Sequence, residues 1–162
     1  MLQTAFCPTS FGCFQIKGSS LGISSVKLVE NVPKEEKEIS EDLKACYQQL
    51  LEYFDGKRET FDLKLDWDGA ADFNRAVWGE LVKIPYGRTT SYSAIAENIG
   101  KPAAVRAVGL ANRNNPIAII VPCHRVIAKN GDLQGYFYGL DMKRRLLELE
   151  NPMSFARQGS LF

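Results

Sequence analysis

The sequence has a single histidine, His124, and only four cysteines among its 162 residues. The four are Cys7, Cys13, Cys46 and Cys123. Their spacing is neither that of a structural zinc site, which needs four closely set ligands, nor that of a compact disulfide framework. We therefore expect no metal and no cofactor, and we expect free thiols in a reducing cytoplasm.

Long apolar runs are also absent. No window of the sequence is long and apolar enough to cross a bilayer, and the N-terminus lacks the basic stretch and apolar run of a secretory signal. These absences predict a cytoplasmic protein that does not associate with membranes. With 45% hydrophobic and 24% charged residues, the composition is that of a globular protein and excludes general disorder, collagen and coiled coils.

The net charge of +1 conceals an asymmetry along the chain. Residues 1–66 carry eight basic and eleven acidic side chains, whereas residues 83–145 carry ten basic and three acidic ones. A solvated basic face would explain the excess, and so would a nucleic-acid footprint in the second half of the chain. Composition alone does not decide between the two.

The first half of the chain predicts a small α/β domain over residues 1–60. The short β-like runs 11–16 and 21–29 are broken by glycines, which favours antiparallel hairpin strands. Apolar residues then recur at helical spacing between Ile39 and Phe54, and Ser40 is placed to cap that helix. We interpret residues 61–70 as a linker, of which residues 61–67 are extended.

The second half predicts a mostly helical domain over residues 71–152, followed by a tail at 153–162. Helical signals begin with the face formed by Phe73, Val77 and Leu81. A second helix has Ser91 as its N-cap and Gly100 as its C-terminal stop, and a third runs over residues 103–113. Two helices joined by such a short turn form a helix-turn-helix. The fold class is therefore α/β of the α+β kind.

The third helix is unusual because small side chains dominate it and Arg106 and Arg113 supply its long cations. Its small residues are Ala103, Ala104, Ala107, Gly109 and Ala111. They make a helix thinner than the ordinary roughly 10–12 Å, and a B-DNA minor groove is about 6 Å wide. Two interpretations stay open: the small face packs against another helix in the core, or it lies in a widened minor groove.

The only histidine adjoins a cysteine at the end of an apolar run. Residues 117–121 predict a short buried strand, which Pro122, Cys123 and His124 follow. The thiolate is the nucleophilic form of cysteine, and an unperturbed thiol has a pKa of about 8.5, so a base such as histidine would have to activate it. A carboxylate would orient the imidazole, and Glu150 is one candidate among several. From spacing alone, an inert cysteine beside a structural histidine is an equally good interpretation.

The segment Pro122–Val126 resembles the active-site signature of the O6-alkylguanine-DNA alkyltransferases, also called methylated-DNA–protein-cysteine methyltransferases. Further segments at that family's spacing are Ile84–Gly87, Thr90–Tyr92, Arg106–Gly109, Asn115–Pro116 and Gly139–Leu140. The likeness covers residues 61–150 in order, and residues 1–60 match the family's variable N-terminal domain only in size and position. It implies DNA repair by a single-turnover transfer of an alkyl group, chiefly methyl, from O6-alkylguanine, and also from O4-alkylthymine, in duplex DNA.

The resemblance implies a role for each of four residues at the reacting centre. Cys123 takes the alkyl group, and His124 draws off the thiol proton through a water molecule. Glu150 orients His124, and Asn115 braces the strand end that holds Cys123.

The resemblance also implies how the damaged base is reached. The helix from Ala103 lies in the minor groove, Tyr92 presses on the 3′ phosphate and can protonate guanine N3, and Arg106 fills the stack left by the flipped base. The other residues expected to contact DNA are Ala104, Ala107, Gly109, Arg113 and Arg125. The expected base pocket consists of Tyr92, Val126, Tyr136, Phe137 and Tyr138. Because Phe137 and Tyr138 are bulkier than the small residues often found there, we predict a preference for methyl over benzyl-sized adducts.

Two other function classes compete with this hypothesis. A non-catalytic helix-turn-helix lesion sensor or transcription regulator would share the DNA-binding layout, but the family's non-transferring relatives have the cysteine replaced, and a regulator would normally dimerise on spaced half-sites. We see no helix to spare for that and expect a monomer. A Cys-His hydrolase acting on a small molecule would leave the basic window and the helix-turn-helix unexplained.

Overall fold

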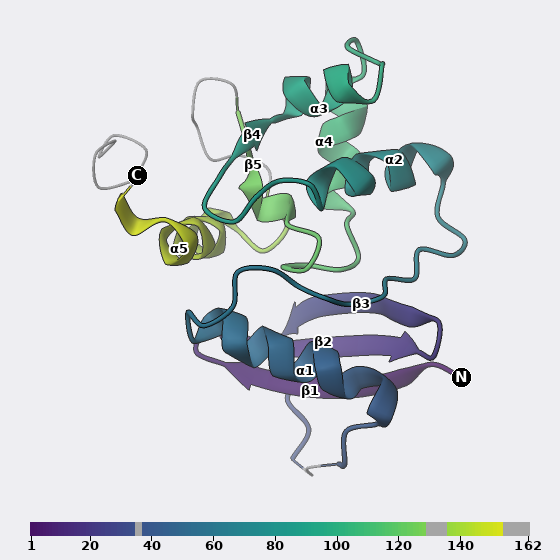
Figure 1. Cartoon of the computed structure of the whole chain (residues 1–162), viewed down its shortest axis with the longest axis vertical. Helices are drawn as coiled ribbons and strands as arrows, with labels where there is room; N and C mark the ends of the chain where they lie inside the picture. The colour runs from purple at the N-terminus through teal and green to yellow at the C-terminus, as the bar shows by residue number, and fades with distance from the viewer. Residues whose placement is uncertain (35–36, 129–135, 154–162) are drawn as a thin grey trace. The chain divides into compact units, whose positions relative to one another are not determined.

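The computed structural model describes residues 1–34, 37–128 and 136–153, and its chain divides into two compact units (Figure 1). The first consists of residues 1–68 together with 116–120, and the second of residues 69–115 and the described residues from 121 on. The sequence predicts a linker over 61–70 and a second domain over 71–152. Residues 61–68 and 116–120 belong instead to the first unit. All but one residue of the predicted tail lie outside the described residues.

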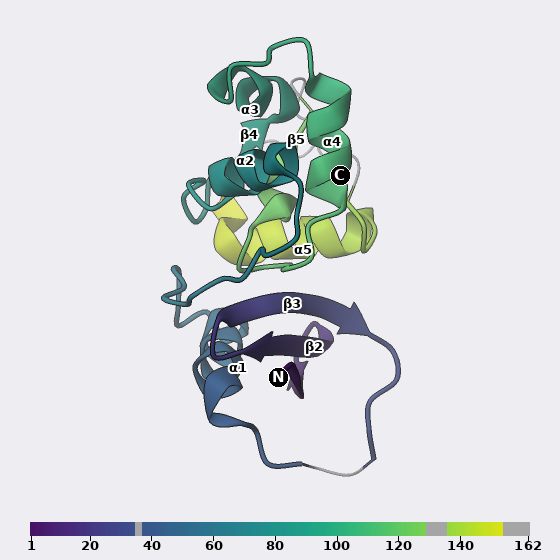
Figure 2. The same ribbon diagram turned by 90° about the vertical axis from the view of Figure 1, so that its right-hand side faces the viewer.

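The first unit is an antiparallel sheet with a helix packed against it (Figure 2). Strands β1 (Gln3–Thr9), β2 (Gly12–Ser19) and β3 (Gly22–Val29) follow one another in the sheet, and α1 (Glu41–Phe54) packs mainly on β1 and β2. Side chains alternate along a strand and recur every three or four residues along a helix. The largest buried residues of β2 and α1 are accordingly Phe14, Ile16, Leu43, Leu50 and Tyr53.

Two short segments cover the outer edge of β3. Ile23 exchanges backbone hydrogen bonds of 2.8 Å with the segment 64–66, and Val26 exchanges bonds of 2.9 Å with the segment 116–118. The first segment runs so close that a Cβ on Gly22 would lie 2.7 Å from the Lys64 carbonyl oxygen, and φ at Gly22 is +136°. Only glycine suits that position, and the covered edge is protected from pairing with another chain.

The helix-turn-helix predicted from the sequence is present in the second unit. After α2 (Asp72–Leu81), Ser91 caps α3 (Tyr92–Asn98) by accepting a 3.1 Å hydrogen bond from the Ala94 amide. Gly100, at φ +76°, follows the end of α3. The helix predicted over 103–113 begins two residues later, as α4 (Val105–Arg113). The Trp78 indole donates to the Ala111 carbonyl at 2.8 Å, which ties α2 to α4.

The rest of this unit carries the cysteine-histidine pair. A 3-10 turn, η1 (Cys123–Arg125), leads into β5 (Val126–Ile127), which pairs in parallel with β4 (Thr90–Ser91), and α5 (Leu140–Glu150) follows. The predicted strand over 117–121 is wrong. Only Ile117 forms a bridge, to Val26, and φ at Ile119 is +72°, which no strand accommodates. The apolar run indicates burial but not backbone conformation.

No helix within the described ranges has the length and apolar character needed to cross a membrane.

Candidate active site

Cys123 is a buried thiol at the start of η1, with 5% of its surface exposed. Burial raises the pKa of this thiol to about 11, although a hydrogen bond with Asn115 and the charge of Lys143 both lower it. With such a pKa, only about one molecule in ten thousand would hold the thiolate at pH 7. Any reaction of the sulfur as a nucleophile therefore needs a base that takes its proton.

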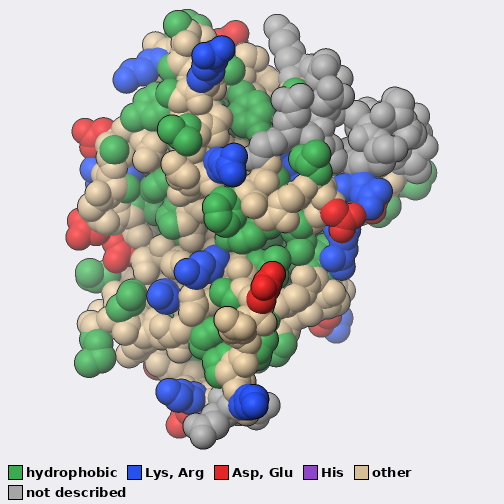
Figure 3. Space-filling model, turned by 180° about the vertical axis from the view of Figure 1, so that it is seen from behind, with side chains coloured by type: hydrophobic (Ala, Val, Ile, Leu, Met, Phe, Trp, Pro, Cys, Tyr) green, Lys and Arg blue, Asp and Glu red, His purple; other side chains and the backbone are tan. Residues whose placement is uncertain are grey.

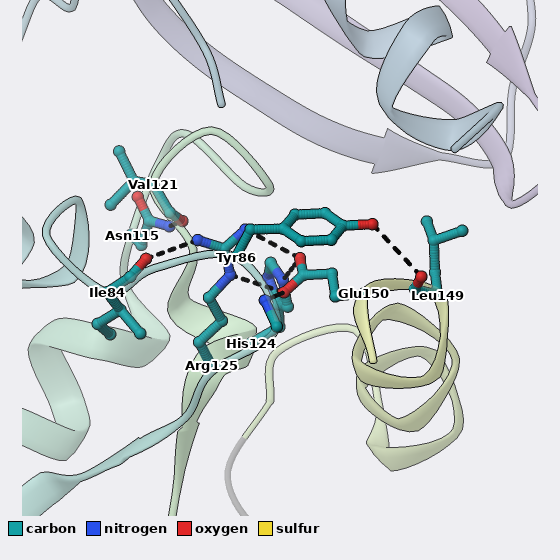
Figure 4. Close-up of polar contacts among 9 residues, drawn as sticks. Ile84, Tyr86, Asn115, Val121, His124, Arg125, Leu149 and Glu150 are labelled. Atoms are coloured by element: carbon teal, nitrogen blue, oxygen red, sulfur yellow. Dashed lines mark hydrogen bonds and ion pairs between the residues drawn. The ribbon is translucent and has the colours of Figure 1, made fainter. Parts of the chain in front are cut away.

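Two buried side chains from η1 converge on the carboxylate at the end of α5 (Figure 4). His124 Nε2 lies 2.7 Å from Glu150 Oε2, while Arg125 donates from Nε to Oε1 at 2.8 Å and from Nη2 to Oε2 at 3.0 Å. Burial raises the pKa of Glu150, but its contacts with His124 and Arg125 outweigh burial and hold that pKa well below its ordinary value. The structure thus brings Glu150 to His124 as a charged acceptor.

This arrangement assigns the tautomer of His124. A carboxylate can only accept, so Nε2 carries the proton, and Nδ1 keeps its lone pair without a hydrogen-bond partner among the residues that the structure describes. Burial lowers the pKa of His124, although Glu150 raises it, so the ring is neutral near pH 7. The ring has no exposed surface, and no histidine is visible on the face drawn in Figure 3. Nδ1 of a neutral imidazole, on the residue that follows Cys123, has the lone pair needed to accept a proton.

Arg125 does not occupy the place expected from the sequence. It is expected to contact DNA, yet it is 6% exposed, and its third donor, Nη1, bonds the Ile84 carbonyl oxygen at 2.7 Å. The guanidinium also lies over the ring of Tyr86, 5.7 Å from its centroid. The expectation is therefore wrong, because Arg125 neutralises Glu150 inside the unit. The sequence shows that an arginine is present, but not which way it faces.

Two asparagines hold the backbone around Cys123. Asn112 lies in the last turn of α4, and Asn115 follows the end of that helix. Asn115, which the sequence predicts as a brace, donates from Nδ2 to the Val121 carbonyl at 2.8 Å and also bonds the Cys123 thiol. Asn112 is 1% exposed and donates from Nδ2 to the Cys123 carbonyl at 3.3 Å. Sequence reasoning misses Asn112, because a polar residue in an amphipathic helix gives no sign of the backbone group it reaches.

Lys143 is a further functional candidate that sequence reasoning misses. Its side chain on α5 is fully buried, and Nζ donates to the Val126 carbonyl at 2.5 Å. Burial lowers the pKa of Lys143 to about 8, and the neighbouring Cys123 raises it. Lysine is rarely buried unless its charge is used, and here that charge favours the thiolate. The available signal was its helical spacing with Leu146 and Glu150, which places it on the buried face of α5.

The five residues predicted to line the base pocket differ in exposure. Val126 is fully buried and Tyr136 is 8% exposed, whereas Phe137 is 61% exposed and Tyr92 and Tyr138 are half-buried. The Tyr138 ring meets those of Tyr136 and Phe137 edge-on, at centroid distances of 5.6 and 5.0 Å. Burial raises the pKa of Tyr92, as does the nearby Cys123. The Tyr92 phenol is therefore protonated and able to donate.

The small residues of α4 are divided between its outer and inner sides. Of the residues expected to contact DNA, Arg106, Ala107 and Arg113 are exposed, and Ala104 and Gly109 are half-buried. A Cβ on Gly109 would lie 3.9 Å from the Tyr92 ring, an ordinary contact distance, so α4 lies beside that tyrosine without the contact requiring a glycine. Ala111 is 1% exposed and packs inward. The helix thus packs on the core with one set of small residues and presents another, beside arginines, to solvent.

The other cysteines are free and buried in the first unit. Burial raises the pKa of Cys7 and of Cys46 to about 12, and it raises that of Cys13 as well. Buried thiols with raised pKa values are poor nucleophiles and poor metal ligands. Across residues 1–34, 37–128 and 136–153, no group of three or more histidine, cysteine or acidic side chains is placed to hold a metal ion.

Comparison with known proteins covers both units. Family models match residues 72–152, as the DNA binding domain of 6-O-methylguanine DNA methyltransferase, and residues 3–67, as its ribonuclease-like domain. The methylated-DNA–protein-cysteine methyltransferase of Methanosarcina acetivorans is 46% identical over 151 residues, which cover 90% of this chain and 96% of that protein. The Methanosarcina barkeri protein of the same name is 60% identical over 103 residues, which cover 64% of this chain and 65% of that protein.

A solved structure agrees with these sequence matches. The crystal structure of Mycobacterium tuberculosis OGT in complex with DNA has a TM-score of 0.80 and 43% sequence identity, covering 93% of this chain and 92% of that one. The family models together span nearly all of the first 152 residues, and the M. acetivorans relative matches along almost its whole length. The chain therefore belongs to the 6-O-methylguanine-DNA methyltransferase family.

Proposed function

We propose that this protein repairs DNA by moving an alkyl group, chiefly methyl, from O6 of guanine to Cys123, in one turnover that consumes the protein. The observation that carries the proposal is the buried thiol of Cys123 followed by a neutral His124 whose Nε2 is fixed by Glu150 and whose Nδ1 is available. Family membership supports the same reaction, and the DNA-bound relative supports DNA as the partner. O4-alkylthymine is a second substrate of the same site, and the protein acts as a monomer.

The chemical step begins with a proton transfer. The Cys123 proton passes through a water molecule to His124 Nδ1, and the resulting imidazolium is stabilised by the Glu150 carboxylate 2.7 Å from Nε2. The ammonium of Lys143 stabilises the thiolate that remains. The sulfur attacks the alkyl carbon, the bond between that carbon and O6 breaks, and its electron pair stays with guanine. Tyr92 donates a proton to guanine N3, so that a neutral base leaves.

The damaged base must leave the DNA stack before Cys123 can reach it. Extruding a base costs a few kcal/mol, and the exposed Arg106 on α4 offsets part of this cost by stacking in the gap. Contacts from α4 to the phosphates and to the groove shape hold the duplex without reading its sequence. This mode of binding suits a protein that must find a lesion in any sequence context.

The reaction ends after one turnover because its product is a thioether. The carbon–sulfur bond is stable in water, and Cys123 is the only cysteine in the sequence after residue 46. The second unit therefore has no other thiol that could take over the alkyl group and restore Cys123. The alkylated protein is the final product.

The proposal is tested with duplex DNA that carries labelled methyl groups on guanine O6. We expect uptake to stop at one methyl per protein molecule, and Cys123→Ser to bind the same DNA without taking up label. Binding without uptake by the wild-type protein would indicate a lesion sensor instead. Release of label into solution over many turnovers would indicate a hydrolase.

A further inference from the structure

The two sides of α4 face different partners. Arg106 and Leu110 lie on its outer side, and Leu110 is 61% exposed. Val108 and Asn112 lie on its inner side and are at most 1% exposed. The outer side of α4 is the one proposed to hold DNA. Its inner side contacts the residue that carries the nucleophile, through the hydrogen bond from Asn112 to the Cys123 carbonyl.

Asn112 is an unfavourable choice for this buried position if only stability matters. Its Nδ2 donates one hydrogen bond of 3.3 Å, but its Oδ1 is buried and has no hydrogen-bond partner within the described part of the chain. A buried acceptor without a partner destabilises a fold, whereas an apolar side chain of similar shape would be neutral or stabilising. Packing alone does not explain why an asparagine stands here.

The bond that Asn112 makes fixes the backbone that carries the sulfur. The Cys123 carbonyl accepts two hydrogen bonds, one from the Val126 amide, which closes η1, and one from Asn112 Nδ2. The first sets the shape of the turn that begins with Cys123. The second ties that turn to α4, so the orientation of the Cys123 peptide depends on the position of this helix.

We propose that Asn112 is a positioning residue that fixes Cys123 relative to α4, so that a base extruded from DNA on the outer side of α4 arrives in line with Sγ. The inference rests on the proposed function, since it assumes that α4 holds the duplex. A free O6-alkylguanine base is not held by α4 and enters the pocket independently. Asn112 therefore affects the reaction with duplex DNA more than the reaction with the free base.

The test is Asn112→Leu, which keeps the volume of the side chain and removes the hydrogen bond. We expect the urea unfolding midpoint to stay the same or rise. Transfer from methylated duplex slows about five- to tenfold, the effect of losing one hydrogen bond that acts in the transition state. Transfer from the free base changes less than twofold. Should the leucine variant fail to fold, Asn112→Ala is measured in its place, with the same expected change in the ratio of the two rates.

Val108→Ala is the matched control, because it also removes a buried contact of α4, one helical turn away, but it takes no hydrogen bond from Cys123. It lowers the unfolding midpoint and leaves the ratio of duplex to free-base rates unchanged. An Asn112 variant whose ratio equals that of the wild type, or whose two rates fall together, overturns the inference. A wild-type protein that takes up no alkyl group would instead overturn the proposed function.

Discussion

Replacing Glu150 by glutamine removes the charge on which His124 and Arg125 converge, with almost no change in size. Its three contacts with these two side chains, at 2.7, 2.8 and 3.0 Å, all lie in the interior, and Oε1 also accepts a longer hydrogen bond of 3.5 Å from the Gly87 amide. Removing one partner of a buried ion pair costs about 3–5 kcal/mol, because the other charge stays buried. Arg125 would keep the Ile84 carbonyl and the Tyr86 ring, but it would face a neutral amide in place of the carboxylate. Since glutamine retains one accepting oxygen, we expect the lower end, about 3 kcal/mol of unfolding free energy.

The same change weakens the base. Without the carboxylate, the imidazolium that forms when His124 takes the thiol proton loses its stabilising anion, and Nε2 is no longer held as a donor. Positioned proton transfer contributes about 10²–10⁴-fold to catalysis, so we expect transfer to slow at least about 10²-fold. The measurements are urea unfolding midpoints and single-turnover transfer from methylated duplex.

Glu148→Gln provides the control, because Glu148 lies half-buried on the same helix, two residues earlier. This variant is expected to unfold within about 0.5 kcal/mol of the wild type, as ordinary surface substitutions do, and to transfer at the wild-type rate. If Glu150→Gln behaved like this control in both assays, the reasoning about the buried carboxylate would be refuted.

Four further predictions concern the charged groups around the sulfur and on the DNA-binding helix, and the pH dependence of transfer and of stability. Lys143→Met removes a cation that lowers the pKa of Cys123. We expect transfer at pH 7 to slow about tenfold, the effect of one pKa unit, and the thiolate absorbance of Cys123 to appear at higher pH. An unchanged titration of Cys123 would contradict this role. Arg106→Ala is expected to slow transfer from duplex more than from the free base, and equal slowing of both would count against its role in flipping. The pKa of His124 is lowered below its ordinary value of 6.5, so transfer should stay constant as the pH falls to about 6.5 and decline only below it. The pKa of Glu150 is lowered below 4.5, so its contribution to stability is complete above that pH and is lost as the pH falls further, a dependence that Glu150→Gln should lack.

Local signals in the sequence predicted local structure well. Ser91 and Gly100 act through hydrogen bonds and backbone angles within a few residues of themselves, so the bounds of α3 could be predicted without knowing what surrounds it. The apolar run 117–121 carried no such signal, although its turn at Ile119 is spanned by a local hydrogen bond from the Ile120 amide to the Ala118 carbonyl. Burial was therefore predictable there, while the backbone path was not.

At the candidate site, the sequence indicated which residue types were present but not their directions. Cys123 and His124 were recognisable as neighbours, and the structure brings Glu150 to His124 as predicted. Arg125 was expected to face DNA but turns inward, and Lys143 was overlooked because a lysine is ordinarily solvated. Both depend on long-range contacts between η1 and α5, which a single sequence does not reveal.

The central claim is that one sulfur atom accepts the alkyl group. It is tested most directly by incubating the protein with duplex DNA containing O6-methylguanine, measuring its intact mass and mapping its peptides. The account predicts a mass increase of a single methyl group, located on Cys123, in a protein that remains folded. An unmodified Cys123 in a folded protein exposed to an excess of the damaged DNA would contradict it.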